Sequence, residues 1–202
     1  MNDKTKIIIL LVLFALVIIL GYVNIGLISN NNCQSEFNKT VKEASSIENI
    51  SDIEYQKYYN SSITSSDDSI KAFKNKSKYI DDEIRVLQSF NDKSDNDALD
   101  DYVNLEIKRL TSEKEAFDYL IKDMENYNQY KNNTITKEHA LSVSNQNTRE
   151  LEKINDNTFN IKSECEYYVN MHLDIKKTLI ELNVDDDFYM NNINYCNITK
   201  II

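Results

Sequence analysis

The 202-residue chain contains no proline, and its two glycines, Gly21 and Gly26, both lie in one apolar segment near the start. Tight turns between β-strands usually need Gly, Asn or Pro, and of these only Asn is plentiful elsewhere. From Phe37 onward apolar residues recur every three or four positions, as in an amphipathic helix, and strand-like alternation is not sustained. The sequence therefore predicts an all-α protein, with the length of one domain plus an anchor.

The anchor is an apolar run that follows Lys4 and Lys6, unbroken over residues 7–20 and extended to residue 28. At 1.5 Å per residue, about 20 helical residues cross the ~30 Å hydrocarbon layer of a bilayer. The exit from the run lacks the small residues of a cleavage site, which favours a signal anchor over a cleaved signal peptide. A lipoprotein interpretation of Cys33 fails because polar residues 29–32 precede it.

The two lysines precede the run, so the positive-inside rule places residues 1–6 in the cytoplasm, residues 7–28 in the cell membrane and residues 29–202 outside. Of the 33 acidic and 23 basic residues in the chain, Asp3, Lys4 and Lys6 precede the run. The exterior part is left with 32 acidic and 21 basic residues, a formal net charge of −11. Such a surface repels nucleic acid and anionic headgroups, so no nucleic-acid partner is expected.

Asn-x-Ser/Thr sequons suit an exported glycoprotein, although several are expected by chance in a chain this rich in Asn. They begin at Asn38, Asn49, Asn60, Asn75, Asn132 and Asn197.

In the part of the chain expected to lie outside the membrane, the recurrence of apolar residues every three or four positions predicts about four long helices. The first carries a stripe from Phe37 to Tyr58 that includes Ile47, Ile50 and Ile53, with a break allowed near Asn49 and a capping box of Ser51 and Glu54. The others are expected from residues 66–68 to 90–92, from 94 to 131 and from 136 to 183, the last two joined by a left-handed cap at residues 132–133. Residues 188–197 are expected to form a short helix or tail that returns along the bundle.

Short polar links between long helices favour antiparallel neighbours, here three helical hairpins in series with coiled-coil-like packing. Polar residues recur on the inward stripes, which predicts a thin, elongated bundle. These residues are Ser77, Glu106, Glu113, Asn147 and Thr158.

Three cysteines outside the cytoplasm suggest one disulfide and one odd thiol. Counting along antiparallel helices places Cys33 level with about Asp95, and at a height similar to that of Cys196. We therefore favour Cys33–Cys196. Cys165–Cys196 is the alternative if the tail is extended, and three reduced core cysteines are the third interpretation.

Glu106 and Glu113 lie seven residues apart on the inward face of the third helix. A di-metal bundle would also need Glu-x-x-His, which neither histidine supplies. We expect instead a partly solvated seam in which Lys162 and Lys153 neutralise the two carboxylates.

Other acidic segments also lack a ligand set. The loop that starts at Asp92 has Asp97 where calcium loops need Gly, and Val103 where they need Glu. Acidic runs at 81–83 and 185–187 are explained by a solvated face and a helix cap. With no phosphate-binding glycine loop and no nucleophile–base pair, no catalytic, cofactor or metal residue is predicted and the chain is not expected to be an enzyme.

These features predict a membrane-anchored, extracytoplasmic structural or interaction protein that presents a helical bundle to a protein partner or to itself. The alternative is a ligand-binding or sensory ectodomain. Because only about six residues remain in the cytoplasm, such an ectodomain would act through a membrane partner.

Overall fold

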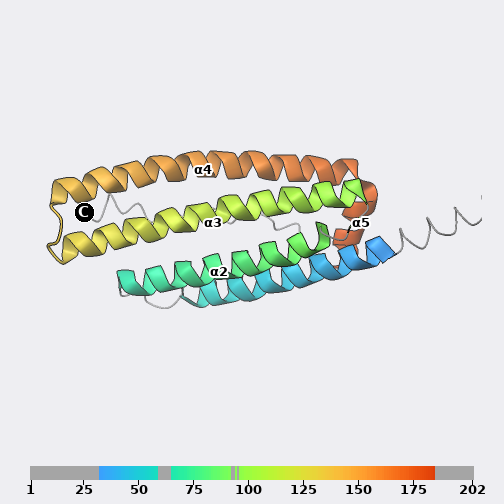
Figure 1. Ribbon diagram of the computed structural model, residues 1–202, viewed down its shortest axis with the longest axis horizontal. Coiled ribbons are helices and arrows are strands. Elements are labelled where there is room, and N and C mark those ends of the chain that lie inside the picture. Colours follow the sequence, from blue (N-terminus) through green and yellow to red (C-terminus); the bar gives the residue numbers. More distant parts are fainter. Residues whose placement is uncertain (1–31, 59–64, 92–93, 95, 185–202) are drawn as a thin grey trace, which may run out of the picture.

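The computed structural model describes residues 32–58, 65–91, 94 and 96–184. Among them are a helix over residues 32–58, α2 (Ser66–Asn91), α3 (Asp97–Lys131), α4 (Lys137–Met171) and α5 (Leu173–Glu181). Figure 1 shows an elongated antiparallel bundle in which α3 lies between α2 and α4. The predicted helical bundle is confirmed. No helix in the described ranges is long and apolar enough to cross a membrane, and the expected anchor, residues 7–28, lies outside those ranges.

Polar side chains cap the helix starts in place of glycine and proline turns. The hydroxyl of Ser65 accepts the backbone N–H of Asp68 in α2, and the side chain of Asn96 accepts two N–H groups in the first turn of α3. Thr136 caps α4 in the same way. Asn133, between α3 and α4, has φ 57°, a left-handed conformation that Asn tolerates better than most residues. The predicted cap at residues 132–133 is confirmed.

Two aromatic clusters join the 32–58 helix to α2 and α3. In the first, Phe37 packs edge-on against Phe90 and Tyr102, with ring centroids 5.6 and 5.8 Å apart. Edge-on pairs of this kind contribute beyond the area they bury. The second cluster lies farther along the same helices and contains Tyr55, Phe73 and Phe117, with centroids 5.9 to 6.4 Å apart.

The interface between α3 and α4 is more polar than the interfaces at which the aromatic clusters join the 32–58 helix to α2 and α3. Ser112 and Thr158 share a hydrogen bond of 2.7 Å, and the carboxylate of Asp123 accepts from Ser144 and Asn147 at 3.3 Å each. Pairing of this kind is what makes buried polar groups tolerable. The inward polar positions expected from the sequence are confirmed, since Ser77, Glu106, Glu113, Asn147 and Thr158 are all buried.

The fourth helix does not run unbroken to residue 183 as expected. It ends at Met171, and His172, with φ −111° and ψ 82°, separates it from α5. The hydroxyl of Tyr168 donates to the carbonyl of Ala98, so α4 has already reached the start of α3 at this point. A straight continuation would carry the apolar side chains of residues 175 and 179 past the end of the bundle. The break instead lets α5 fold across the bundle and bury both of them.

The first helix also differs from its prediction. It is continuous through residue 49, and Ser51 lies inside it as a buried residue rather than as a cap. Ile50 and Ile53 are 48% and 55% exposed. The inward stripe follows positions 37, 41, 44, 48, 51 and 55 at strict three-and-four spacing, and this stripe includes the polar side chains of Glu48 and Ser51. The prediction followed the isoleucines, whose spacing of three drifts off that face.

Candidate functional site: a buried charge cluster and an adjoining cleft

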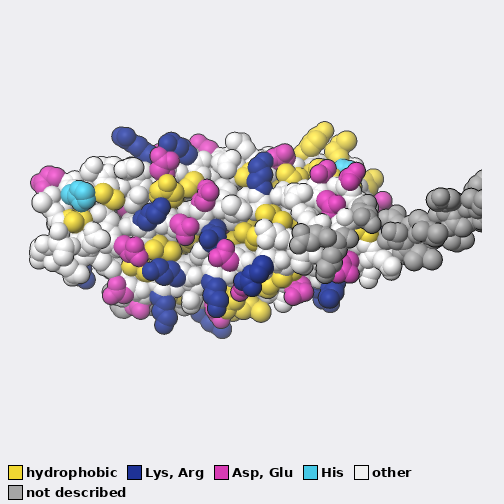
Figure 2. Space-filling view, viewed as in Figure 1, with side chains coloured by type: hydrophobic (Ala, Val, Ile, Leu, Met, Phe, Trp, Pro, Cys, Tyr) yellow, Lys and Arg dark blue, Asp and Glu magenta, His cyan; other side chains and the backbone are white. Residues whose placement is uncertain are grey.

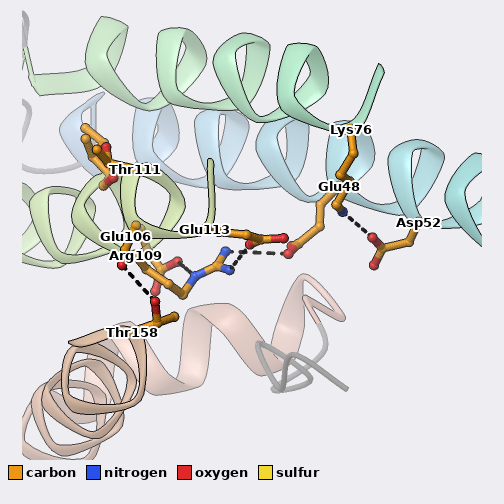
Figure 3. Close-up of polar contacts among 10 residues, drawn as sticks. Glu48, Asp52, Lys76, Glu106, Arg109, Thr111, Glu113 and Thr158 are labelled. Carbon is orange, nitrogen blue, oxygen red and sulfur yellow. Dashed lines mark hydrogen bonds and ion pairs between the residues drawn. The ribbon is translucent and has the colours of Figure 1, made fainter. Parts of the chain in front are cut away.

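A cluster of charged side chains in the middle of the bundle centres on Arg109 of α3, which is 2% exposed. Its Nε donates to Glu106 at 2.9 Å and its Nη1 donates to Glu113 at 3.3 Å. Residues three and four positions apart share a helix face, so this spacing places both carboxylates beside the guanidinium. Nη2 pairs with Glu48 of the 32–58 helix at 3.5 Å (Figure 3). One arginine thus links two helices.

The other two long helices add charges to the cluster. Glu83 of α2 is 4% exposed, and Lys76 of α2 is buried and pairs with Asp52 of the 32–58 helix. Lys162 of α4 is half-buried and interacts electrostatically with Arg109, which repels it, and with Glu113, which attracts it. We call this set the Arg109 cluster. Its members are Glu48, Lys76, Glu83, Glu106, Arg109, Glu113 and Lys162.

Burial and charge act in opposite directions within the cluster. Burial alone would lower the pKa of Arg109, but Glu106, Glu48 and Glu113 outweigh it and raise that pKa above its ordinary value. The pKa of Glu83 is raised well above its ordinary value, first by burial and then by the nearby Glu48 carboxylate. Burial also raises the pKa of Glu48, and Arg109 opposes this rise only in part. The arginine is therefore firmly charged, while Glu48 and Glu83 hold protons more readily than exposed carboxyls do.

A cleft of about 170 Å³ adjoins the cluster between α3, α4 and α5. It exists because the break at His172 turns α5 back over α3 and α4. Its lining combines apolar side chains with three cations and two carboxylates. The lining residues are Tyr102, Glu106, Arg109, Lys162, Cys165, Glu166, Val169, Asn170, Lys176 and Leu179.

Cys165 in the cleft wall is poorly suited to nucleophilic chemistry. Burial, followed by the nearby Glu106 carboxylate, raises the pKa of its thiol to about 12. The thiolate is the reactive form of cysteine, and at neutral pH almost none would be present. Cys165 therefore acts as part of the packed wall.

The disulfide predictions stay predictions. Cys33 Sγ lies 3.4 Å from Ser94 Oγ, close to the height that counting along the helices gave it. Neither Cys33 nor Cys165 is in a disulfide within the described ranges, and Cys196, the partner in both predicted pairs, lies outside them.

The remaining sequence candidates do not gather into a site. Within the described ranges, no group of three or more His, Cys, Asp or Glu side chains is arranged to hold a metal ion. His139 is exposed near the α3–α4 turn, and His172 stacks on Tyr168 at the α4–α5 break. Of the sequon residues, Asn49, Asn75 and Asn132 are exposed and Asn38 is half-buried, while residues 60 and 197 lie outside the described ranges.

Two expectations about charge were wrong. Lys153 does not neutralise the inward carboxylates, because it is 70% exposed and pairs with Glu150 of its own helix. Glu83 is not on a solvated face, because the α2 stripe that contains Ile80 and Leu87 turns it inward. The sequence carried the missing signal in the arginine that stands at helical spacing between Glu106 and Glu113, a placement that suits a buried counter-ion better than a lysine on another helix.

Comparisons with protein-family models, with curated proteins and with solved structures each find no match for this chain.

Replacing Arg109 by Leu should lower the free energy of unfolding by about 3–5 kcal/mol at neutral pH, because it leaves buried carboxylates without their cation. Arg109→Lys should retain part of the stability, since lysine keeps the charge but loses the planar fork. Urea unfolding of the full chain in detergent measures both. Arg85→Leu is the matched control, because Arg85 is 72% exposed and its loss should cost less than about 0.5 kcal/mol. Equal losses for Arg109→Leu and Arg85→Leu would contradict this role.

Glu83 should make the bundle less stable as pH rises. Its pKa is higher in the folded state than in the unfolded chain, so the stability it contributes is complete below about pH 4.3 and is lost as pH rises through the folded pKa. Glu83→Gln should therefore raise the unfolding free energy at pH 7 and change it little at acid pH. Chemical denaturation across pH measures the difference, with Glu115→Gln, at an exposed position of α3, as control. A Glu83→Gln variant that is less stable than the unaltered chain at pH 7 would contradict this prediction.

Proposed function

We propose that this chain is a membrane-anchored interaction protein whose helical bundle lies outside the cytoplasm and binds a protein partner through the outer face of α4. The apolar run of residues 7–28 and the two lysines before it support the anchor and its orientation. The observation that supports the binding face is a pair of exposed aromatic side chains, Phe159 and Tyr167, on the outer face of α4.

Five of the seven large hydrophobic side chains that are exposed in the described part of the chain lie between residues 159 and 180. Single exposed apolar residues are ordinary, but a concentration of them marks a candidate contact surface. Figure 2 shows hydrophobic side chains gathered over the end of α4, beside acidic ones. On α4 these include Phe159 and Tyr167, which are 69% and 68% exposed and face away from the buried Ile161 and Cys165.

The charge around Phe159 and Tyr167 selects the kind of partner. Between residues 156 and 171 the exposed charged side chains of α4 are all acidic: Asp156, Glu164 and Glu166. Glu164 is paired with the exposed Lys108 of α3 at 3.2 Å, so Asp156 and Glu166 carry the acidic character of this face. Two copies of this face would repel each other, whereas a partner with Lys or Arg around an apolar pocket would be attracted. We therefore propose a basic protein partner rather than a second copy of this chain.

Removing both aromatic rings should abolish binding without unfolding the bundle. A photo-crosslinking residue at Ser163, which is exposed between the two rings, would capture the partner in intact cells. The crosslink should be lost in a Phe159→Ser, Tyr167→Ser variant and weakened by high salt, with the unfolding free energy changed by less than about 0.5 kcal/mol. Ile50→Ser with Ile53→Ser is the control, because it removes exposed apolar area from another helix. A crosslink that survives the aromatic substitutions would exclude this face.

A second function, a ligand-binding ectodomain, is supported by the cleft. Its apolar residues Tyr102, Val169 and Leu179 suit the apolar part of a small organic molecule. Its three cations, which include Lys162 and Lys176, outnumber its two carboxylates, which favours an anion. Short aliphatic or aromatic carboxylates should then raise the melting temperature of the full chain, and Lys162→Met should remove that increase. No increase with any of these acids would count against the cleft as a binding site.

A further inference from the structure

The exposed apolar side chains of α5 lie at the end of the bundle, next to Met171, the last residue of α4. Leu173 and Ile180 are 72% and 61% exposed and lie seven residues apart, which places them on one face of this helix. Lys177 lies between them on the same face, with its side chain 75% exposed, and pairs with Glu181 at 3.7 Å. The opposite face carries the buried Ile175 and Leu179. Thus α5 is apolar on both faces, and the described part of the bundle covers only one of them.

This surface lies at the end of the bundle where the described chain begins. The side chain of Gln34 donates to Thr178 of α5, and Figure 1 shows α5 running from the end of α4 toward the start of the 32–58 helix. Only a few residues separate that start from the apolar run, which ends at residue 28. A chain extends at most about 3.6 Å per residue, so four residues span no more than ~14 Å. A bilayer that holds the run would therefore come close to α5.

The composition of α5 suits the boundary between lipid and water. Its charged residues are two lysines, Lys176 and Lys177, and two acids, Asp174 and Glu181, so its formal charge is zero although the exterior part is strongly acidic. Lysine can keep its amine in water while its methylenes lie against lipid. A helix with apolar residues flanking a lysine on its outer face resembles helices that lie in the plane of a membrane interface.

We propose that the outer face of α5, formed by Leu173, Lys177 and Ile180, lies with Met171 of α4 in the headgroup layer of the bilayer that holds the anchor. The proposal rests on the proposed membrane anchor. The bilayer would have zwitterionic headgroups, because the rest of the exterior surface is acidic. Phe159 is twelve residues from Met171, or about 18 Å along α4, whereas the headgroup layer is only ~5–8 Å thick. Phe159 therefore lies outside the lipid contact, whereas Tyr167, four residues or about 6 Å from Met171, lies at its border.

The chain contains no tryptophan, so a single introduced Trp reports its own surroundings. Full-length Leu173→Trp and Ile180→Trp would be reconstituted in phosphatidylcholine vesicles with and without brominated acyl chains. We expect their emission to shift to shorter wavelength and to be quenched by the brominated lipid. Phe159→Trp, at an equally exposed position, should emit at the wavelength of water-exposed Trp and escape quenching.

A fourth variant distinguishes a failure of the α5 proposal from a failure of the proposed membrane anchor. Phe14→Trp lies in the apolar run and should be quenched if that run is in the bilayer. Quenching at position 14 without quenching at 173 and 180 would overturn the α5 proposal and leave the anchor intact. No quenching at position 14 would overturn the anchor and the α5 proposal with it. A shift to shorter wavelength at 173 without quenching would mean that protein covers this face, which also overturns lipid contact.

Discussion

The rest of the bundle depends on the ion pairs that the buried guanidinium of Arg109 forms with the carboxylates around it. Removing a charge from water costs several kcal/mol, and only well-placed partners offset that cost. Arg109 finds these partners on its own helix and on the 32–58 helix, while α2 and α4 supply the other charges around it. The two aromatic clusters lie on either side of this layer along the 32–58 helix, α2 and α3. Sliding any one helix by a turn would leave carboxylates unpaired, so we infer that the cluster fixes the register of helices whose apolar stripes alone would tolerate slippage.

The break at His172 is the second constraint, and it follows from the length of α3. Once Tyr168 has reached the first residues of α3, a straight α4 has nothing further to pack against. Turning at His172 covers Ile175 and Leu179, leaves a cleft beside the Arg109 cluster and exposes the other face of α5. The cleft and the outer surface of α5 are thus consequences of one change in chain direction.

The sequence was sufficient to predict the helices because their signals are local. Asn133 has the left-handed conformation predicted for the cap at residues 132–133, and the inward polar residues of α3 and α4 are buried as their spacing required. The features that the sequence did not predict are set by contacts between residues far apart in the chain. The break at His172 depends on where α3 begins, and the inward position of Glu48 depends on a partner 61 residues away. The prediction placed Ile50 and Ile53 inward because they are apolar. The inward face of this helix instead includes the polar residues Glu48 and Ser51, which a search for apolar periodicity passes over.

The claim that one arginine ties the 32–58 helix to α3 can be measured by a double-mutant cycle. The unfolding free energy would be determined for the full chain, for Arg109→Leu, for Glu48→Gln and for the double variant in the same detergent. If the two side chains interact across the helices as described, the costs should fail to add by at least about 1 kcal/mol, as they do for residues in one ion-pair network. Costs that add to within about 0.3 kcal/mol would show that the two helices are held together without this contact.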